Sequence, residues 1–244
     1  IYFYTIIMKK FLLLTVSAFL GLSSFAQSKH NSDDSSRPFF GARLSIDASI
    51  PCSMKTEVGS VKLSTKPFGT GGGVSVGGVV NFPIVSNLYV EPGIDLYYHT
   101  NSINMGNLTG NPEIEDNDFT ARSLRKFGMR VPVQIGYRYD FSSSQTAVSV
   151  FTGPVLNVGF SNDYYITTKE IEGVKVHSSG SMYDEMQRVN LSWRIGFGVT
   201  FLNNYYVALS GDIGMLNMLK QKDKDSKIKM HENGFQLTLG YNFK

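Results

Sequence analysis

Hydrophobic and polar residues alternate along most of this chain with the period of two that a β-strand produces. The clearest example is VNLSWRIGFGVTF at 189–201, where every second residue is apolar and the residues between are small or polar apart from Arg194. Eight segments show this alternation, and they cover residues 39–50, 73–82, 87–99, 127–140, 146–160, 189–201, 205–217 and 233–243. The pattern therefore predicts an all-β protein built from eight strands.

The connections between these segments alternate in length. The long connections cover 51–72, 100–126, 161–188 and 218–232, and the short ones cover 83–86, 141–145 and 202–204. Tight turns at one end and long loops at the other are typical of an up-and-down barrel in a bacterial outer membrane. We therefore expect an eight-stranded antiparallel up-and-down transmembrane β-barrel with short periplasmic turns and long extracellular loops.

Charged residues occupy only one of the two faces of these segments. An Arg or Lys on a lipid-facing surface costs about 2–4 kcal/mol at the bilayer midplane, whereas a narrow lumen accommodates glycine and a few paired charges. We therefore assign the bulky uncharged face to lipid and the glycine-rich charged face to the lumen. The predicted lumenal charge network consists of Arg43, Asp47, Glu91, Asp95, Arg130, Arg138, Asp140, Arg194 and Asp212. A soluble barrel similar to a lipocalin, with the two faces exchanged, is the competing fold.

Aromatic residues on the uncharged face gather at the strand ends beside the short turns. Aromatic side chains are enriched at both membrane–water interfaces, so their clustering at one level supports the membrane assignment. The predicted periplasmic girdle consists of Phe40, Phe82, Tyr137, Tyr139, Phe201, Tyr205, Tyr241 and Phe243. A sparser outer girdle is predicted from Tyr98, Phe127, Phe160 and Phe235.

The N-terminal region has the three parts of a secretory signal peptide. Met8-Lys9-Lys10 precedes the apolar run FLLLTVSAFLGL, and small residues follow up to Ala26. This run is short for a membrane-spanning helix, so we expect export through a cleaved signal peptide to the outer membrane of a Gram-negative bacterium. The expected organisation is upstream over-translation at 1–7, signal peptide at 8–26, flexible leader at 27–38 and outer-membrane β-barrel domain at 39–244.

The overall composition excludes two other classes of protein. The formal net charge is only +3, and the lysines do not alternate with aromatic residues, so a nucleic-acid partner is not expected. Cys52 is the single cysteine in the sequence, which excludes an internal disulfide framework.

Five segments carry a resemblance to a known family. They are LYVEPGIDLYYH at 88–99, FGMRVPVQIGYRY at 127–139, FTGPVLNVGFS at 151–161, WRIGFGVTF at 193–201 and FQLTLGYNFK at 235–244. Together they resemble successive hairpins of the PorT-like outer-membrane β-barrel domain family, chiefly through the Arg-Val-Pro-Val run and the Gly-Pro pair. The resemblance implies an eight-stranded outer-membrane barrel but no particular activity. The last segment also resembles the signal that the barrel-assembly machinery reads during insertion.

No segment carries a complete catalytic or cofactor motif. The glycine run at 69–78 lacks the Gly-Lys-Ser/Thr ending of a phosphate loop, and the four histidines have no ligand spacing. His177 and Ser178 could form a hydrolytic pair, but no carboxylate partner is identifiable. We therefore predict no catalytic, cofactor-binding or metal-binding residues and no cofactor.

Two of the long loops carry clusters of charge. The acidic cluster of Glu113, Glu115, Asp116 and Asp118 offers oxygen ligands for calcium, but its spacing matches no known calcium loop. The lysine-rich stretch at 219–230 could contact lipopolysaccharide phosphates or simply keep its loop soluble. We interpret both clusters as solvated loop surface.

The leading functional prediction is a non-enzymatic outer-membrane barrel with a structural or surface-interaction role through its long extracellular loops. An eight-stranded lumen is just wide enough to be filled by side chains, so we expect a packed interior. The alternatives are a narrow pore for small solutes or ions and a lipid-modifying barrel enzyme. The expected partners are outer-membrane lipid and lipopolysaccharide, the barrel-assembly machinery, and an extracellular or periplasmic protein that the sequence does not identify.

Overall fold

The computed structural model describes residues 37–58, 61–85, 87–109, 111, 113–114, 118–141, 145–170, 174–220 and 226–243. The predicted over-translation, signal peptide and most of the leader lie outside these residues. The strands are β1 (Phe39–Ser49), β2 (Cys52–Val58), β3 (Val61–Val85), β4 (Leu88–Ile103), β5 (Phe119–Phe141), β6 (Thr146–Thr168), β7 (His177–Ser181), β8 (Val189–Phe201), β9 (Tyr205–Gly214), β10 (Ser226–Met230) and β11 (Gly234–Phe243). Two short helical turns accompany them, α2 (Met105–Thr109) and the 3₁₀ turn η3 (Met182–Asp184).

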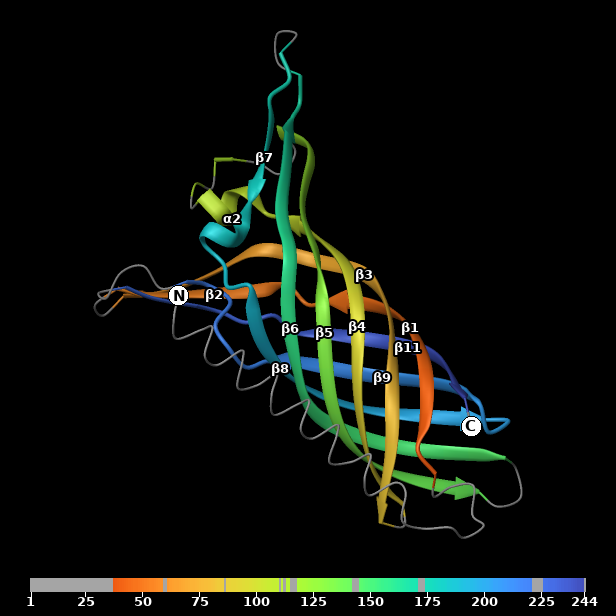
Figure 1. Cartoon of the computed structure of the whole chain (residues 1–244). Helices are drawn as coiled ribbons and strands as arrows, with labels where there is room; N and C mark the ends of the chain where they lie inside the picture. Colours follow the sequence, from red (N-terminus) through yellow and green to blue (C-terminus); the bar gives the residue numbers. More distant parts are fainter. Residues whose placement is uncertain are drawn as a thin grey trace.

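Eight of these strands form a closed antiparallel barrel (Figure 1). The order around the barrel is β1, β11, β9, β8, β6, β5, β4 and β3, and the ring closes because β3 also pairs with β1. Strand alternation in the sequence identified all eight, since each predicted segment overlaps one of them. The prediction of an all-β antiparallel barrel is confirmed.

The two faces of the wall differ in the direction expected for a barrel in lipid. Along β1 the inward Arg43 is 6% exposed, whereas the neighbouring outward Leu44 is 55% exposed. The same contrast repeats around the ring, where buried polar side chains face the lumen and exposed Val, Ile, Leu and aromatic residues face outward. A soluble barrel would have the opposite arrangement, so the lipocalin-like alternative is excluded.

The prediction of four long loops is wrong for much of their described length. Residues 61–72 belong to β3, residues 119–126 belong to β5, and residues 161–168 belong to β6. In addition, β2 pairs with β3 and with β10, and β7 pairs with β6. The sequence did not reveal these strands because backbone pairing in water requires no apolar alternation. They form two arms, β2–β3–β10 and β5–β6–β7, which Figure 1 shows extending beyond the barrel in different directions.

Above the barrel, residues from all four long connections form one apolar cluster, which we call the cap. Its buried members are Cys52, Phe68, Ile103, Leu124, Tyr183, Met186, Met218 and Met230. Met54, Met105 and Met182 pack against them, so six of the nine methionines in the sequence meet here. Methionine is flexible and polarisable and fills irregular space between elements of different direction. Among the described residues, no helix is long and apolar enough to cross a membrane.

Candidate functional site

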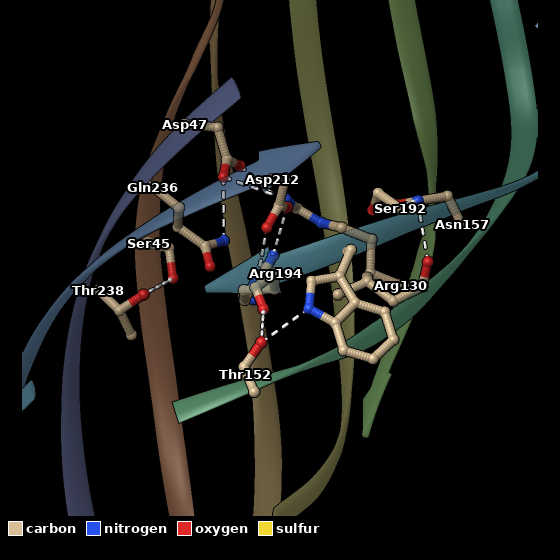
Figure 2. Close-up of polar contacts among 12 residues, drawn as sticks. Ser45, Asp47, Arg130, Thr152, Asn157, Ser192, Arg194, Asp212, Gln236 and Thr238 are labelled. Carbon is tan, nitrogen blue, oxygen red and sulfur yellow. Dashed lines mark hydrogen bonds and ion pairs between the residues drawn. The ribbon is translucent and has the colours of Figure 1, made fainter. Parts of the chain in front are cut away.

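Two bidentate ion pairs lie in the middle of the lumen (Figure 2). Arg130 on β5 donates to Asp47 on β1, from Nη1 to Oδ1 at 3.1 Å and from Nη2 to Oδ2 at 2.6 Å. Because β1 and β5 are not neighbours in the ring, this pair spans the lumen. Gln236 on β11 also donates to Asp47, at 2.9 Å, so the carboxylate is held from two strands.

The second pair joins neighbouring strands at the same level. Arg194 on β8 donates to Asp212 on β9, from Nε to Oδ1 at 2.6 Å and from Nη2 to Oδ2 at 2.7 Å. The two residues are direct cross-strand partners, and Arg194 is only 3% exposed. We call Asp47, Arg130, Arg194, Asp212 and Gln236 the central layer.

The central layer separates two cavities in the lumen. The upper cavity, towards the cap, has a volume of about 130 Å³ and is lined by Asp47, Arg130 and Asp212 among others. The lower cavity has a volume of only about 30 Å³ and is lined by Arg194 and Gln236. A volume of about 30 Å³ corresponds to a single water molecule, so side chains fill the lumen below the central layer.

The remaining predicted charges lie towards the short-turn end. Arg43 lies 3.6 Å from Glu91, which also accepts a hydrogen bond from Asn81 at 3.0 Å. Arg138 pairs with Asp140 at 2.9 Å on the more exposed rim. Asp95 is buried and lines the lower cavity, but no cation lies within ion-pair distance of it in the described chain. The structure thus brings eight of the nine predicted charges into four pairs.

Sequence reasoning missed a fifth pair at the top of the lumen. Lys126 lies 2.6 Å from Glu232, which precedes β11. Burial alone would raise the pKa of Glu232, but the Lys126 ammonium holds that pKa below its ordinary value. Lys126 has the inward parity of Arg130 and lies one residue before the predicted segment. Extending the alternation by that residue would have found it.

Aromatic side chains fill much of the lumen, which the sequence interpretation assigned to small residues and charges. Tyr89 and Phe151 are buried, and each covers an inward glycine on a neighbouring strand. A Cβ on Gly136 would overlap the Tyr89 ring, and a Cβ on Gly196 would overlap the Phe151 ring. The inward glycines therefore make room for rings as well as for charges. Two further lumenal rings stack on arginines, Tyr206 with Arg43 at 4.4 Å and Tyr97 with Arg130 at 5.0 Å.

The aromatic residues at the short-turn end form an outward band. Exposed rings contact one another in the series Phe201, Tyr205, Tyr241 and Phe243, with centroid separations of 5.1–6.1 Å. Phe40, Tyr137 and Tyr139 are also exposed, but Phe82 is only 9% exposed, so its prediction as an exposed girdle residue is wrong. The β3–β4 register shifts beside it, between Pro83 and Val85. The band also includes Phe141, which lay one residue beyond the predicted strand and contacts Tyr139 at 5.0 Å.

One polar contact stabilises the outer wall itself. The indole N–H of Trp193 donates to the Thr152 hydroxyl at 2.7 Å, and that hydroxyl donates to the Arg194 carbonyl at 2.9 Å (Figure 2). Each polar group in contact with lipid must find its partner within the protein. The indole N–H of Trp193 and the hydroxyl of Thr152 meet this requirement by bonding to each other.

The loop candidates do not assemble into a site. His177 Nδ1 lies 3.0 Å from the Thr167 hydroxyl rather than from a serine. Glu115 and Asp116 of the acidic cluster, and Lys222 and Lys224 of the lysine-rich stretch, lie outside the described residues. Within the described ranges, no group of three or more His, Cys, Asp and Glu side chains is arranged to hold a metal ion.

The family to which the sequence is similar agrees with the barrel architecture. Residues 15–243 match the family described as Outer membrane protein beta-barrel domain. Among solved structures, OprG from Pseudomonas aeruginosa is 10% identical, with a TM-score of 0.42 over 84% of this chain and 95% of that chain. Ail, the attachment invasion locus protein of Yersinia pestis, is 12% identical, with a TM-score of 0.33 over 84% of this chain and 99% of that chain. No curated protein matches the chain.

Proposed function

The chain belongs to the outer membrane protein beta-barrel domain family, and from this premise we propose that it is a non-enzymatic, non-conducting barrel that acts at the cell surface through its cap and arms. The observation that carries this proposal is the central layer. Two bidentate ion pairs and Gln236 occupy the lumen and leave about 30 Å³ of free space below them. Opening the lumen would break one of these pairs and leave a buried charge unpaired, which costs free energy. The central layer is therefore suited to block the lumen and unsuited to open as a gate.

We assign the outward aromatic band at the short-turn end to the periplasmic interface, in agreement with the even strand number. The cap and both arms then lie outside the cell, where lipopolysaccharide surrounds them. We further propose export through the signal peptide at 8–26, insertion by the barrel-assembly machinery and a relationship to the PorT-like members of the family. The alternating Phe235, Leu237, Leu239, Tyr241 and Phe243 of β11 support the insertion step.

The arms offer the surface for a protein partner. Among the described strands, β7 pairs only with β6 and presents one free backbone edge. The far edge of β10 is not free in this way, because Asn217 and Met218 bond backbone groups of that strand. Free edges are sites at which another chain can add a strand. Val174 and Val176, just before β7, are 62% and 55% exposed, which gives this edge apolar contacts as well.

Planar-bilayer recording tests the plug directly. We expect the purified barrel to show no steady ion current, because the central layer blocks the lumen. A steady current that changes in an Arg194→Lys variant would support the pore instead. Lipid A that changes when the gene is deleted would support the lipid-modifying enzyme.

Labelling of intact cells tests the orientation. A Val174→Cys variant should react with a membrane-impermeant maleimide, because its position is exposed on the outer arm. A Gln145→Cys variant, in the short β5–β6 turn, is the matched control and should react only after the outer membrane is permeabilised. The reverse result would place the cap in the periplasm and overturn the proposed surface role.

A further inference from the structure

The upper cavity, which we call the vestibule, lies between the central layer and the cap. Its lining includes Arg130 and Asp212 of the central layer and Tyr183 and Met218 of the cap. Its volume of about 130 Å³ equals that of about four water molecules at about 30 Å³ each. The vestibule is therefore large enough for one small solute. Arg188 is exposed and the Glu232 side chain is 27% exposed, so solvent reaches these two residues of the vestibule lining.

Most of the charges that line the vestibule are already paired. Lys126 pairs with Glu232, and Arg130 pairs with Asp47. Asp212 also lines the cavity, but both its oxygens accept hydrogen bonds from Arg194 beneath it. Asp95, the carboxylate without an ion pair, lines the other cavity. Among the described residues that line the vestibule, Arg188 is therefore the one Lys or Arg side chain without an anionic partner, although the lining as a whole holds three such cations and three carboxylates.

Two arginines of the vestibule have guanidinium N–H groups that bond no acceptor among the described residues. The Arg188 guanidinium stacks over the Tyr183 ring at 4.5 Å, which holds it in place but leaves its N–H groups without a carboxylate. The Nε–H group of Arg130, a residue that is only 8% exposed, has no acceptor. A buried donor without an acceptor carries a cost in the free energy of folding. A bound acceptor would recover that cost.

We propose that the vestibule binds one small anion, a carboxylate or another oxyanion, held by Arg188 and the Nε–H group of Arg130. The anion would pair with the Arg188 guanidinium and accept hydrogen bonds from both arginines, which are strong when donor and acceptor are both charged. The cap encloses it from above, so its size is limited to a few heavy atoms. This site is independent of whether the arms bind a protein partner.

NMR of the arginine side chains tests the proposal on the full chain in detergent micelles. Sodium acetate and sodium sulfate are titrated separately at constant ionic strength while the Nε–H signals of Arg130 and Arg188 are followed. We expect saturable shifts of both signals with at least one of the two anions, and the anion that binds shows whether the site prefers a planar carboxylate or a tetrahedral oxyanion. Absence of a saturable shift with either anion would overturn the proposal.

Two variants separate a bound anion from a general effect of salt. Arg188→Gln should weaken binding at least about tenfold, because one charged hydrogen-bond donor is lost. Arg125→Gln is the matched control, because Arg125 also stacks on a tyrosine, Tyr165 at 4.3 Å, but does not line the vestibule. Binding that is unchanged in the first variant or equally weakened in the control would also overturn the proposal.

Discussion

The lumen and the cap are two cores of opposite chemistry built on the same strands. On β5 the inward side chains change from the charged Lys126 to the fully buried Leu124, and on β4 they change from Asn101 to Ile103. Below this level lipid covers the apolar outer face, so the interior can be polar and ion-paired. Above it water covers the outside, and the interior becomes an ordinary apolar core. The surrounding solvent thus decides the chemistry of the interior, and the change occurs within two residues of each strand.

The largest effect is expected from an unpaired charge in the lumen. Arg194→Leu leaves the partly buried Asp212 carboxylate without its two hydrogen bonds, and the loss of one partner of a buried ion pair costs about 3–5 kcal/mol. We expect a clearly lower urea midpoint and loss of heat-modifiable gel mobility. Arg138→Leu removes the exposed rim pair and should cost less than about 1 kcal/mol. Equal behaviour of the two variants would mean that the central layer contributes no more than a surface ion pair.

A cavity in the cap should affect the cap alone. Met186 is 1% exposed, and Met186→Ala should destabilise its surroundings by about 2–5 kcal/mol. We expect faster proteolysis of the arms with unchanged heat-modifiable mobility of the barrel. Met215→Ala, at an exposed position, is the control and should change neither property. Simultaneous loss of both properties in the Met186 variant would show that cap and barrel are a single core.

Acid should loosen the junction between the two cores. The pKa of Glu232 is below its ordinary value of 4.5 because Lys126 favours the carboxylate. The contribution of the pair is therefore complete above about pH 4.5 and is lost as the pH falls through the lowered pKa. We expect the arms to become sensitive to an acid-stable protease on acidification. In a Glu232→Gln variant this sensitivity should be high at every pH, and a wild-type response in that variant would assign the effect to another group.

Thiol chemistry provides the smallest and most local test. Cys52 is buried in the cap, and burial raises the pKa of its thiol to about 11. At pH 7 we expect negligible alkylation of the folded protein and full alkylation after denaturation, as mass spectrometry would show. The Met186→Ala variant should react at an intermediate rate. Rapid alkylation of the wild type would contradict a closed cap.

The sequence was sufficient for the barrel and insufficient for the cap, for physical reasons. Lipid on one side imposes a strict alternation, so the eight wall strands and inward charges such as Arg194 could be assigned from parity alone. The ion-pair partners could not be assigned from parity. Arg130 pairs with Asp47 across the lumen, and parity carries no information about which strands lie on opposite sides. The cap was missed altogether, because its members are separate apolar residues in polar connections and share no local period.

The pairing of β1 with both β3 and β11 also limits the order of assembly. β3 follows β1 closely in the chain, but β11 is the last strand described, and Phe40 pairs with Phe243. Contacts between such distant parts of a chain form late because they close the longest loop. Until they form, β1 and β11 each present an unpaired backbone edge that hydrocarbon cannot satisfy. The wall is therefore complete only when its first and last strands meet, and an intermediate that lacks this contact needs a protein partner to shield its two edges.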